Sequence, residues 1–89
     1  MEITYDQSKN AKNIKERCLS FEEVIEFDFE TDKFSVDLKK HYGEQREIAL
    51  GLLNDRVHVL IFIRTEKGLR VVSLRKANKR EIGEYAQED

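Results

Sequence analysis

The chain has 89 residues, 39% of them hydrophobic, which suits one small folded domain over residues 1–89 and exceeds the apolar content of a disordered tail. Charged residues make up 38% of the chain, yet sixteen Lys and Arg against eighteen Asp and Glu leave a net charge of only −2, which by itself argues against a nucleic-acid partner. No apolar run approaches the ~20 residues that cross a membrane, and the N-terminus does not resemble a signal peptide. A single cysteine excludes an intrachain disulfide. We therefore expect a cytoplasmic protein.

The N-terminal third predicts a short strand followed by two helices. Residues 3–5 fit a short first strand. Asp6 is a suitable N-cap for a helix over residues 7–17, because its carboxylate can accept hydrogen bonds from free backbone N–H groups. The capping-box spacing of Ser20 and Glu23 predicts a second helix. The apolar faces of these helices are expected to consist of Ala11, Ile14 and Cys18 on the first and Phe21, Val24, Ile25 and Phe29 on the second.

Beyond the second helix the hydrophobic period changes to two, which is typical of half-buried strands. Residues 34–38 form the first of these strands, Gly43 marks a turn, and residues 46–53 form the second. Residues 57–63 are apolar on both faces, which predicts a central strand, and residues 69–74 form the last strand. On the strand over residues 46–53, the side chains that share one apolar face are Ile48, Leu50 and Leu52.

The C-terminal segment predicts a last helix, because Asn78 is a good N-cap and Glu81 follows it at capping-box spacing. Its inward-facing residues are expected to be Ile82, Tyr85 and Ala86. The turns at residues 54–55 and 66–68 leave no room for crossovers, so neighbouring strands must be antiparallel. The predicted fold is an α+β domain of two layers, with two N-terminal helices, a four-stranded antiparallel meander sheet and a C-terminal helix.

The near-neutral net charge conceals two charged segments. Residues 22–32 carry six acidic side chains and no basic one, whereas residues 64–80 carry seven basic side chains and one acidic one. A basic segment of this density suits phosphate binding. Charge alone slightly favours the alternative that residues 64–80 are a solvated surface, paired internally with the acidic segment.

Few residues of the chain indicate a catalytic or binding role by themselves. Arg75 and Lys76 lie where a strand ends and a helix begins, and the N–H groups of that helix add positive potential. His58 shares a strand face with Leu60 and Phe62, where a structural histidine is more common than a catalytic one. The chain shows no metal-ligand spacing, no Gly-rich phosphate loop and no nucleophile elbow, so we expect neither metal nor cofactor.

A series of motifs runs in order through nearly the whole chain, and its strongest part is residues 70–81 with Tyr85 after them. The earlier motifs are Tyr5-Asp6, Lys9-Asn10, Asn13, residues 19–23, residues 42–44, Arg46, residues 49–51 and His58-Val59. With these motifs the chain resembles the BrnT family of small toxins from bacterial type II toxin–antitoxin modules. The resemblance departs at Glu16-Arg17, where the family often has Lys-His, and at Tyr5, where it usually has Trp.

The resemblance implies a RelE-like ribonuclease fold and a toxin that arrests growth by cutting RNA. It also implies a cognate antitoxin of the BrnA type, whose ribbon-helix-helix part would make the contacts with operator DNA. Two alternatives stay open, the first because Arg17 cannot act as a base near neutral pH and the second because the basic segment could bind nucleic acid without cutting it. One is a catalytically weakened homologue that serves as a binding or co-repressor module, and the other is a plain nucleic-acid-binding adaptor.

Metal-independent RNA cleavage uses the neighbouring 2′-hydroxyl as the nucleophile and needs a base, an acid and cations for the developing phosphorane charge. The residues predicted at the reacting phosphate are Arg46, Arg75 and Lys76, and those predicted to grip the RNA are Arg64, Arg70, Lys79 and Arg80. The candidates for proton transfer are Glu44, His58 and Tyr85. Each of these three residues also has a structural role that is at least as common as proton transfer. These roles are a contact in a turn for Glu44, a core histidine for His58 and helix packing for Tyr85.

Overall fold

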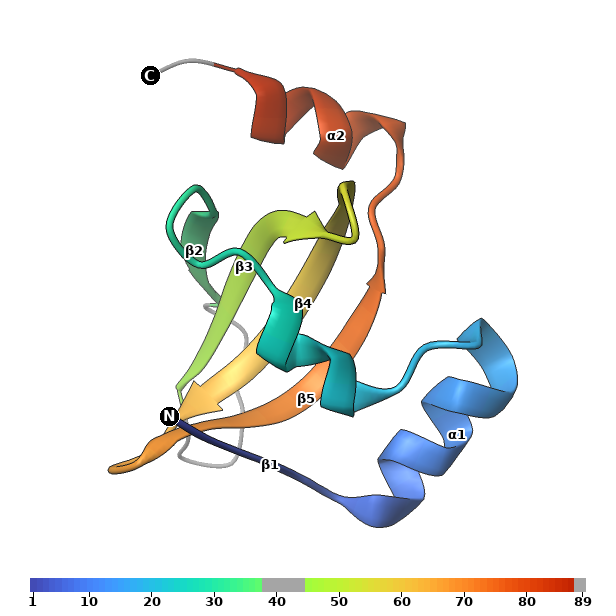
Figure 1. The fold of residues 1–89 in the computed structure, drawn as a ribbon. Helices are drawn as coiled ribbons and strands as arrows, with labels where there is room; N and C mark the ends of the chain where they lie inside the picture. The colour runs from blue at the N-terminus through green and yellow to red at the C-terminus, as the bar shows by residue number, and fades with distance from the viewer. Residues whose placement is uncertain (38–44, 88–89) are drawn as a thin grey trace.

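The computed structural model describes residues 1–37 and 45–87 of the chain. Within these residues, five strands form one sheet in the order β1-β5-β4-β3-β2 (Figure 1), and three helical segments accompany them. In chain order the elements are β1 (Glu2–Tyr5), α1 (Gln7–Arg17), the 3-10 helix η1 (Phe21–Glu26), β2 (Lys33–Asp37), β3 (Arg46–Leu53), β4 (Arg56–Arg64), β5 (Gly68–Lys76) and α2 (Lys79–Ala86). The antiparallel meander of β2 to β5 is confirmed, and so is the central place of β4.

The prediction of a purely antiparallel, four-stranded sheet is wrong, because β1 adds a fifth strand parallel to β5. Ile3 lies opposite Leu69 in this pairing. Hairpin length constrains only strands that follow one another in the chain, and β1 finds its partner far along the sequence. Gly68 permits the close approach, since a Cβ there would lie 2.0 Å from the carbonyl oxygen of Glu2. The domain is therefore α+β with a mixed sheet.

The second predicted helix is a 3-10 helix rather than an α-helix, so the fold has one N-terminal α-helix. The capping box of Ser20 and Glu23 is present as predicted. With three residues per turn, the buried side chains are Phe21, Val24 and Phe27. Ile25, which an α-helical period places on the buried face, is 73% exposed.

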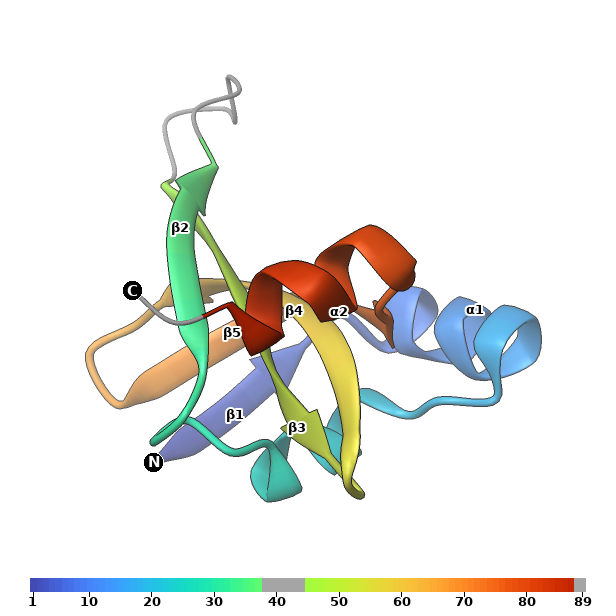
Figure 2. The ribbon, with the colours of Figure 1, turned by 90° about the horizontal axis from the view of Figure 1, so that it is seen from above.

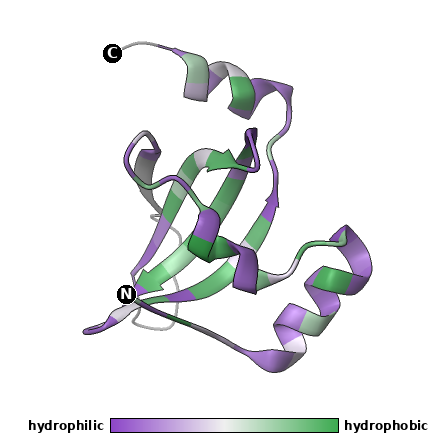
Figure 3. Ribbon diagram, viewed as in Figure 1, coloured by the Kyte–Doolittle hydropathy of each residue, from purple (hydrophilic) through white to green (hydrophobic). Residues whose placement is uncertain are grey.

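Helix α1 has the predicted bounds, and Asp6 caps it by accepting a hydrogen bond from the backbone N–H of Lys9 at 3.0 Å. Its predicted apolar stripe is wrong, because Ala11, Ile14 and Cys18 are all exposed. The buried residues of α1 are two asparagines. Figure 3 shows the contrast between this largely hydrophilic helix and the hydrophobic strands beside it. We therefore infer that polar contacts attach α1 to the domain.

The core lies between η1 and one face of the sheet. On β3 the buried residues are Ala49, Gly51 and Leu53, whereas the predicted apolar face of Ile48, Leu50 and Leu52 is half-buried. The small residues of β3 make room for an aromatic ring, because a Cβ at Gly51 would lie 2.6 Å from Cζ of Phe27. The other buried core residues of the sheet are Leu60, Phe62, Leu69, Val71 and Leu74.

Helix α2 lies across one end of the sheet (Figures 1 and 2) and presents polar groups to it. Its predicted inward face is wrong in two of three residues, since Ile82 and Ala86 are exposed while Glu81 is buried and Tyr85 half-buried. Lys33 donates hydrogen bonds to the carbonyl oxygens of Glu84 and Gln87 at the C-terminal end of the helix. No helix in the described parts of the chain is long and apolar enough to span a membrane.

Candidate functional site

Two of the three predicted phosphate-binding residues meet at the end of β5. Arg75 and Lys76 line a hollow of about 300 Å³ together with Arg17 and Leu19. We call this hollow the cationic pocket. Arg17 ends α1, so the pocket forms where the C-terminal end of α1 approaches the C-terminal end of β5. The cationic pocket therefore contains Arg17, one of the residues at which the chain departs from its family resemblance.

Arg75 is held in the pocket wall by Glu81 of α2. Its guanidinium donates two hydrogen bonds to the carboxylate, each 2.8 Å long, in the bidentate geometry that suits this pair. The carboxylate also accepts a hydrogen bond from the backbone N–H of Asn78, and Asn78 in turn accepts one from the N–H of Glu81. Much of the charge of Arg75 is therefore neutralised. The N–H of Glu81 is also satisfied within the helix cap and is not available to an anion.

This arrangement makes the stability of the domain depend on pH through Glu81. The hydrogen bonds from Arg75 lower the pKa of Glu81 to about 2, against an ordinary value of 4.5. A carboxyl group whose pKa is lower in the folded state than in the unfolded state stabilises the protein at pH values above its unfolded pKa. This stabilisation is lost as the pH falls toward the folded pKa. We expect a loss of about 1–2 kcal/mol of unfolding free energy between pH of roughly 5 and 2, because solvent partly screens the pair.

Chemical denaturation of the wild type and of Glu81→Gln across this range measures the contribution. The variant should be less stable near neutral pH, and the difference between the two proteins should shrink toward pH of about 2. A difference that stays constant with pH would show that Glu81 does not carry this dependence.

His58 lies beside the cationic pocket, on the strand next to β5. Its Cα is paired with that of Lys76 in the register of β4 and β5. The side chain is 4% exposed, and its Nδ1 lies 2.8 Å from the carbonyl oxygen of Arg56. A carbonyl only accepts, so Nδ1 carries the proton and Nε2 is left as the basic nitrogen. This hydrogen bond therefore leaves Nε2, and not Nδ1, as the nitrogen that could accept a proton.

Three other predicted RNA-contacting arginines, Arg46, Arg64 and Arg70, lie toward the opposite end of the sheet. Arg46 begins β3, five residues from Gly51, which is paired with His58. At about 3.3 Å per residue, this separation is about 17 Å along the sheet. Arg64 ends β4 and forms an ion pair with Glu47, with 2.6 Å between Nε and Oε2. Arg46 and Arg64 therefore do not share a phosphate with Lys76, and Arg70 lies six residues before Lys76 on β5.

Other predicted site residues are dispersed over α2 or lie outside the described chain. The Tyr85 hydroxyl is 3.2 Å from Oγ1 of Thr31, which places it with the turn before β2. Arg80 is exposed and pairs with Glu84 at 3.4 Å. Lys79 is exposed at the start of α2. Glu44 and the turn predicted at Gly43 fall among the residues that are not described.

Asn10 and Asn13 belong to the family motifs, but the sequence analysis gave neither of them a structural role. Oδ1 of Asn10 accepts a hydrogen bond from the backbone N–H of Phe21 at 2.8 Å. Nδ2 of Asn13 donates to the carbonyl oxygens of Leu19 and Leu74 at 2.8 and 3.0 Å, so this one side chain ties α1 to β5. Asparagine is a poor helix former, and two of them inside one helix were the available signal.

Asn13 also positions Arg17. Its Oδ1 accepts a hydrogen bond from Nη1 of Arg17 at 2.7 Å. Arg17 is thereby oriented toward β5 by a side chain that is itself fixed at two points. The guanidinium keeps its full charge, because its partner is a neutral amide.

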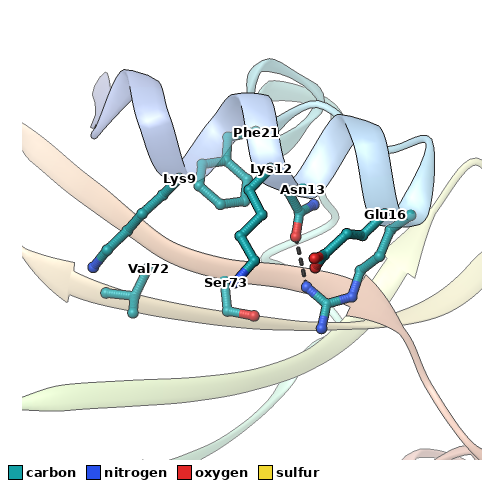
Figure 4. A pocket seen from close by; sticks show the side chains of 8 residues that line it. Lys9, Lys12, Asn13, Glu16, Phe21, Val72 and Ser73 are labelled. Carbon is teal, nitrogen blue, oxygen red and sulfur yellow. Dashed lines mark hydrogen bonds between the residues drawn. The ribbon is translucent and has the colours of Figure 1, made fainter.

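A second hollow, of about 190 Å³, continues from Arg17 along α1 (Figure 4). We call it the α1 groove. The residues that line it are Lys9, Lys12, Asn13, Glu16, Arg17, Phe21, Val72 and Ser73. Because Arg17 lines both hollows, the α1 groove and the cationic pocket adjoin one another.

Comparison with known families assigns most of the chain. Among the described residues, no three His, Cys, Asp or Glu side chains form a group that could hold a metal ion. A family described as "Ribonuclease toxin, BrnT, of type II toxin-antitoxin system" matches residues 5–81. No curated protein matches the chain.

Proposed function

The chain belongs to the BrnT family of ribonuclease toxins from type II toxin–antitoxin systems, and from this premise we propose that it is a metal-independent endoribonuclease that acts in the cytoplasm. The observation that carries the proposal is the convergence of Arg17, Arg75 and Lys76 in one pocket with His58 next to it. We place the scissile phosphate in this cationic pocket. The antiparallel meander, with helical segments before it and a helix after it, supports a RelE-like fold.

The proposed reaction is attack of a ribose 2′-hydroxyl on the adjacent phosphorus. His58 takes the hydroxyl proton at Nε2, the new O2′–P bond forms, and the O5′–P bond breaks. The 5′-oxygen takes a proton from water, which leaves a 2′,3′-cyclic phosphate and a 5′-hydroxyl. Lys76 and Arg17 stabilise the phosphorane, since neither cation is neutralised by a carboxylate within the described residues.

Arg75 has a different role in this scheme. Its bidentate bond with Glu81 fixes the wall of the pocket and joins the end of β5 to the start of α2. We therefore treat Arg75 as a positioning residue and Lys76 as the main cation at the phosphate. Arg46, Arg64 and Arg70 would contact RNA only beyond the reacting phosphate.

The proposal is tested by incubating the purified chain with single-stranded RNA in EDTA. We expect cleavage without added metal, products that end in a 2′,3′-cyclic phosphate, and growth arrest when the chain is expressed without its antitoxin. A folded protein that leaves RNA intact under these conditions would contradict the nuclease assignment. Products with a 3′-hydroxyl would contradict the proposed attack by the 2′-hydroxyl.

A type II toxin has an antitoxin partner, and we propose that the partner here is a BrnA-like ribbon-helix-helix protein that covers the cationic pocket. Its contacting segment should bring acidic or apolar groups to Arg17 and Lys76. Operator DNA would be contacted only through this partner. A mapped interface that leaves both side chains accessible would argue against occlusion as the mechanism of inhibition.

One observation favours a second candidate, a toxin homologue that binds its antitoxin but no longer cuts RNA. Arg17 stands in the pocket where the family resemblance leads us to expect a histidine, and an arginine cannot exchange a proton near neutral pH. This candidate predicts tight antitoxin binding together with normal growth on expression. Salt-sensitive RNA binding with no antitoxin gene nearby would instead indicate a plain adaptor.

A further inference from the structure

We propose that the α1 groove is a separate binding site for an RNA backbone phosphate, next to the scissile phosphate in the cationic pocket. The inference rests on the proposed function for the position of the scissile phosphate. The groove itself is defined by its own residues, most of which the cationic pocket does not share.

The groove gathers cations on one face of α1. Lys9 and Lys12 are one turn apart, and Figure 4 shows both side chains reaching from the helix toward Val72 and Ser73 of β5. With Arg17 they supply three positive charges against the single carboxylate of Glu16. Within the described chain, neither lysine forms an ion pair. Their charge is therefore available to an anion from outside.

The groove is also preorganised at the end where it meets the cationic pocket. Asn13 holds the guanidinium of Arg17 and is itself bonded to the carbonyl oxygens of Leu19 and Leu74. Because Arg17 lies between the two hollows, a strand whose scissile phosphate contacts Lys76 would pass Arg17 as it enters the groove. Fixing this cation in advance lowers the entropy lost on binding.

The chemistry of the groove favours a phosphate over a base. Its only aromatic side chain is Phe21, which is 1% exposed and so offers no face for stacking. The lysine ammonium groups and the hydroxyl of Ser73 donate hydrogen bonds, as phosphate oxygens require. Contacts to phosphates carry no direct sequence information, so this site contributes affinity rather than base specificity.

The test is equilibrium binding of a 2′-O-methyl RNA decamer, which lacks the nucleophile and cannot be cut by the proposed reaction. We expect the double variant Lys9→Ala/Lys12→Ala to bind about 10- to 100-fold more weakly than wild type. The slope of the logarithm of the binding constant against the logarithm of the salt concentration should become shallower by about 1.4. Each phosphate contact on a single strand contributes about 0.7 to this slope, and the variant loses two such contacts. A matched control, Lys15→Ala/Lys67→Ala, removes two exposed charges outside the groove and should stay near wild type.

Three results would overturn the inference: equal binding by the two double variants, no binding of the decamer by wild type, or a free mononucleotide that competes as well as the decamer. The last would indicate a nucleotide site instead of a backbone site. If wild type cuts RNA but Lys9→Ala/Lys12→Ala binds like the control, only the inference fails. If the variant loses binding in a protein that cuts no RNA, the site stands and the nuclease proposal fails.

Discussion

Replacing Asn13 with alanine is expected to lower the free energy of unfolding by about 2–4 kcal/mol. The substitution leaves the carbonyl oxygens of Leu19 and Leu74 without their donor in a buried setting, and each unsatisfied group costs about 1–3 kcal/mol. It also releases Arg17, so RNA cleavage should fall even where the protein is still folded. Urea denaturation of wild type and variant measures the first effect, and cleavage rates well below the unfolding midpoint measure the second.

Two further variants make the Asn13 prediction specific. Asn13→Asp keeps the shape of the side chain but removes both N–H donors, so it should destabilise the domain about as much near neutral pH. Lys15→Ala changes an exposed residue of the same helix and should stay within about 0.5 kcal/mol of wild type. A cost below about 0.5 kcal/mol for Asn13→Ala would mean that these hydrogen bonds do not hold α1 on β5.

A large effect on activity is expected from Lys76→Ala, which should lower kcat/KM for RNA cleavage about 10²- to 10³-fold. Lys76 is exposed, lines the cationic pocket and lies beside His58, so its removal takes away phosphorane stabilisation and no core packing. The thermal midpoint should therefore stay unchanged. Lys67→Ala removes one charge from the same basic segment but lies in the turn before β5, and it should cleave like wild type.

Two comparisons separate the roles of the neighbouring residues. Lys76→Arg keeps the charge and should recover most of the activity if the ammonium acts electrostatically. Arg75→Ala should instead lose stability, because Glu81 is then left in its partly buried place without a partner. Lys76→Ala with normal cleavage, or with a loss no larger than that of Lys67→Ala, would remove Lys76 from the proposed mechanism.

The parts of the fold predicted correctly were those that neighbouring residues determine. Alternating hydrophobicity and short turns located β3 to β5 and their antiparallel pairing. The apolar character of residues 57–63 on both faces placed β4 in the middle of the sheet. The caps at Asp6, Ser20 and Asn78 marked all three helical starts, because each cap bonds to a backbone group within three residues.

The errors share a cause, which is that they concern contacts between distant segments. β1 pairs with β5 across most of the chain, and no local pattern encodes that pairing. Gly51 lies on the buried face of β3 because Phe27 fills the space above it. Asn13 is buried because two carbonyl oxygens, one of them on β5, need a donor.

The sequence by itself determined the domain class, the family and the segregation of charge behind a net charge of −2. Local hydrophobic periodicity and helix capping were sufficient for the domain class, and motif spacing was sufficient for the family. Only the tertiary structure divided the basic segment, because β5 carries Arg70 and Lys76 about 20 Å apart and Glu81 neutralises much of the charge on Arg75. It also brought Arg17, Lys9 and Lys12 of α1 together beside β5. Which cations face one phosphate depends on distances through space, and those are set by packing.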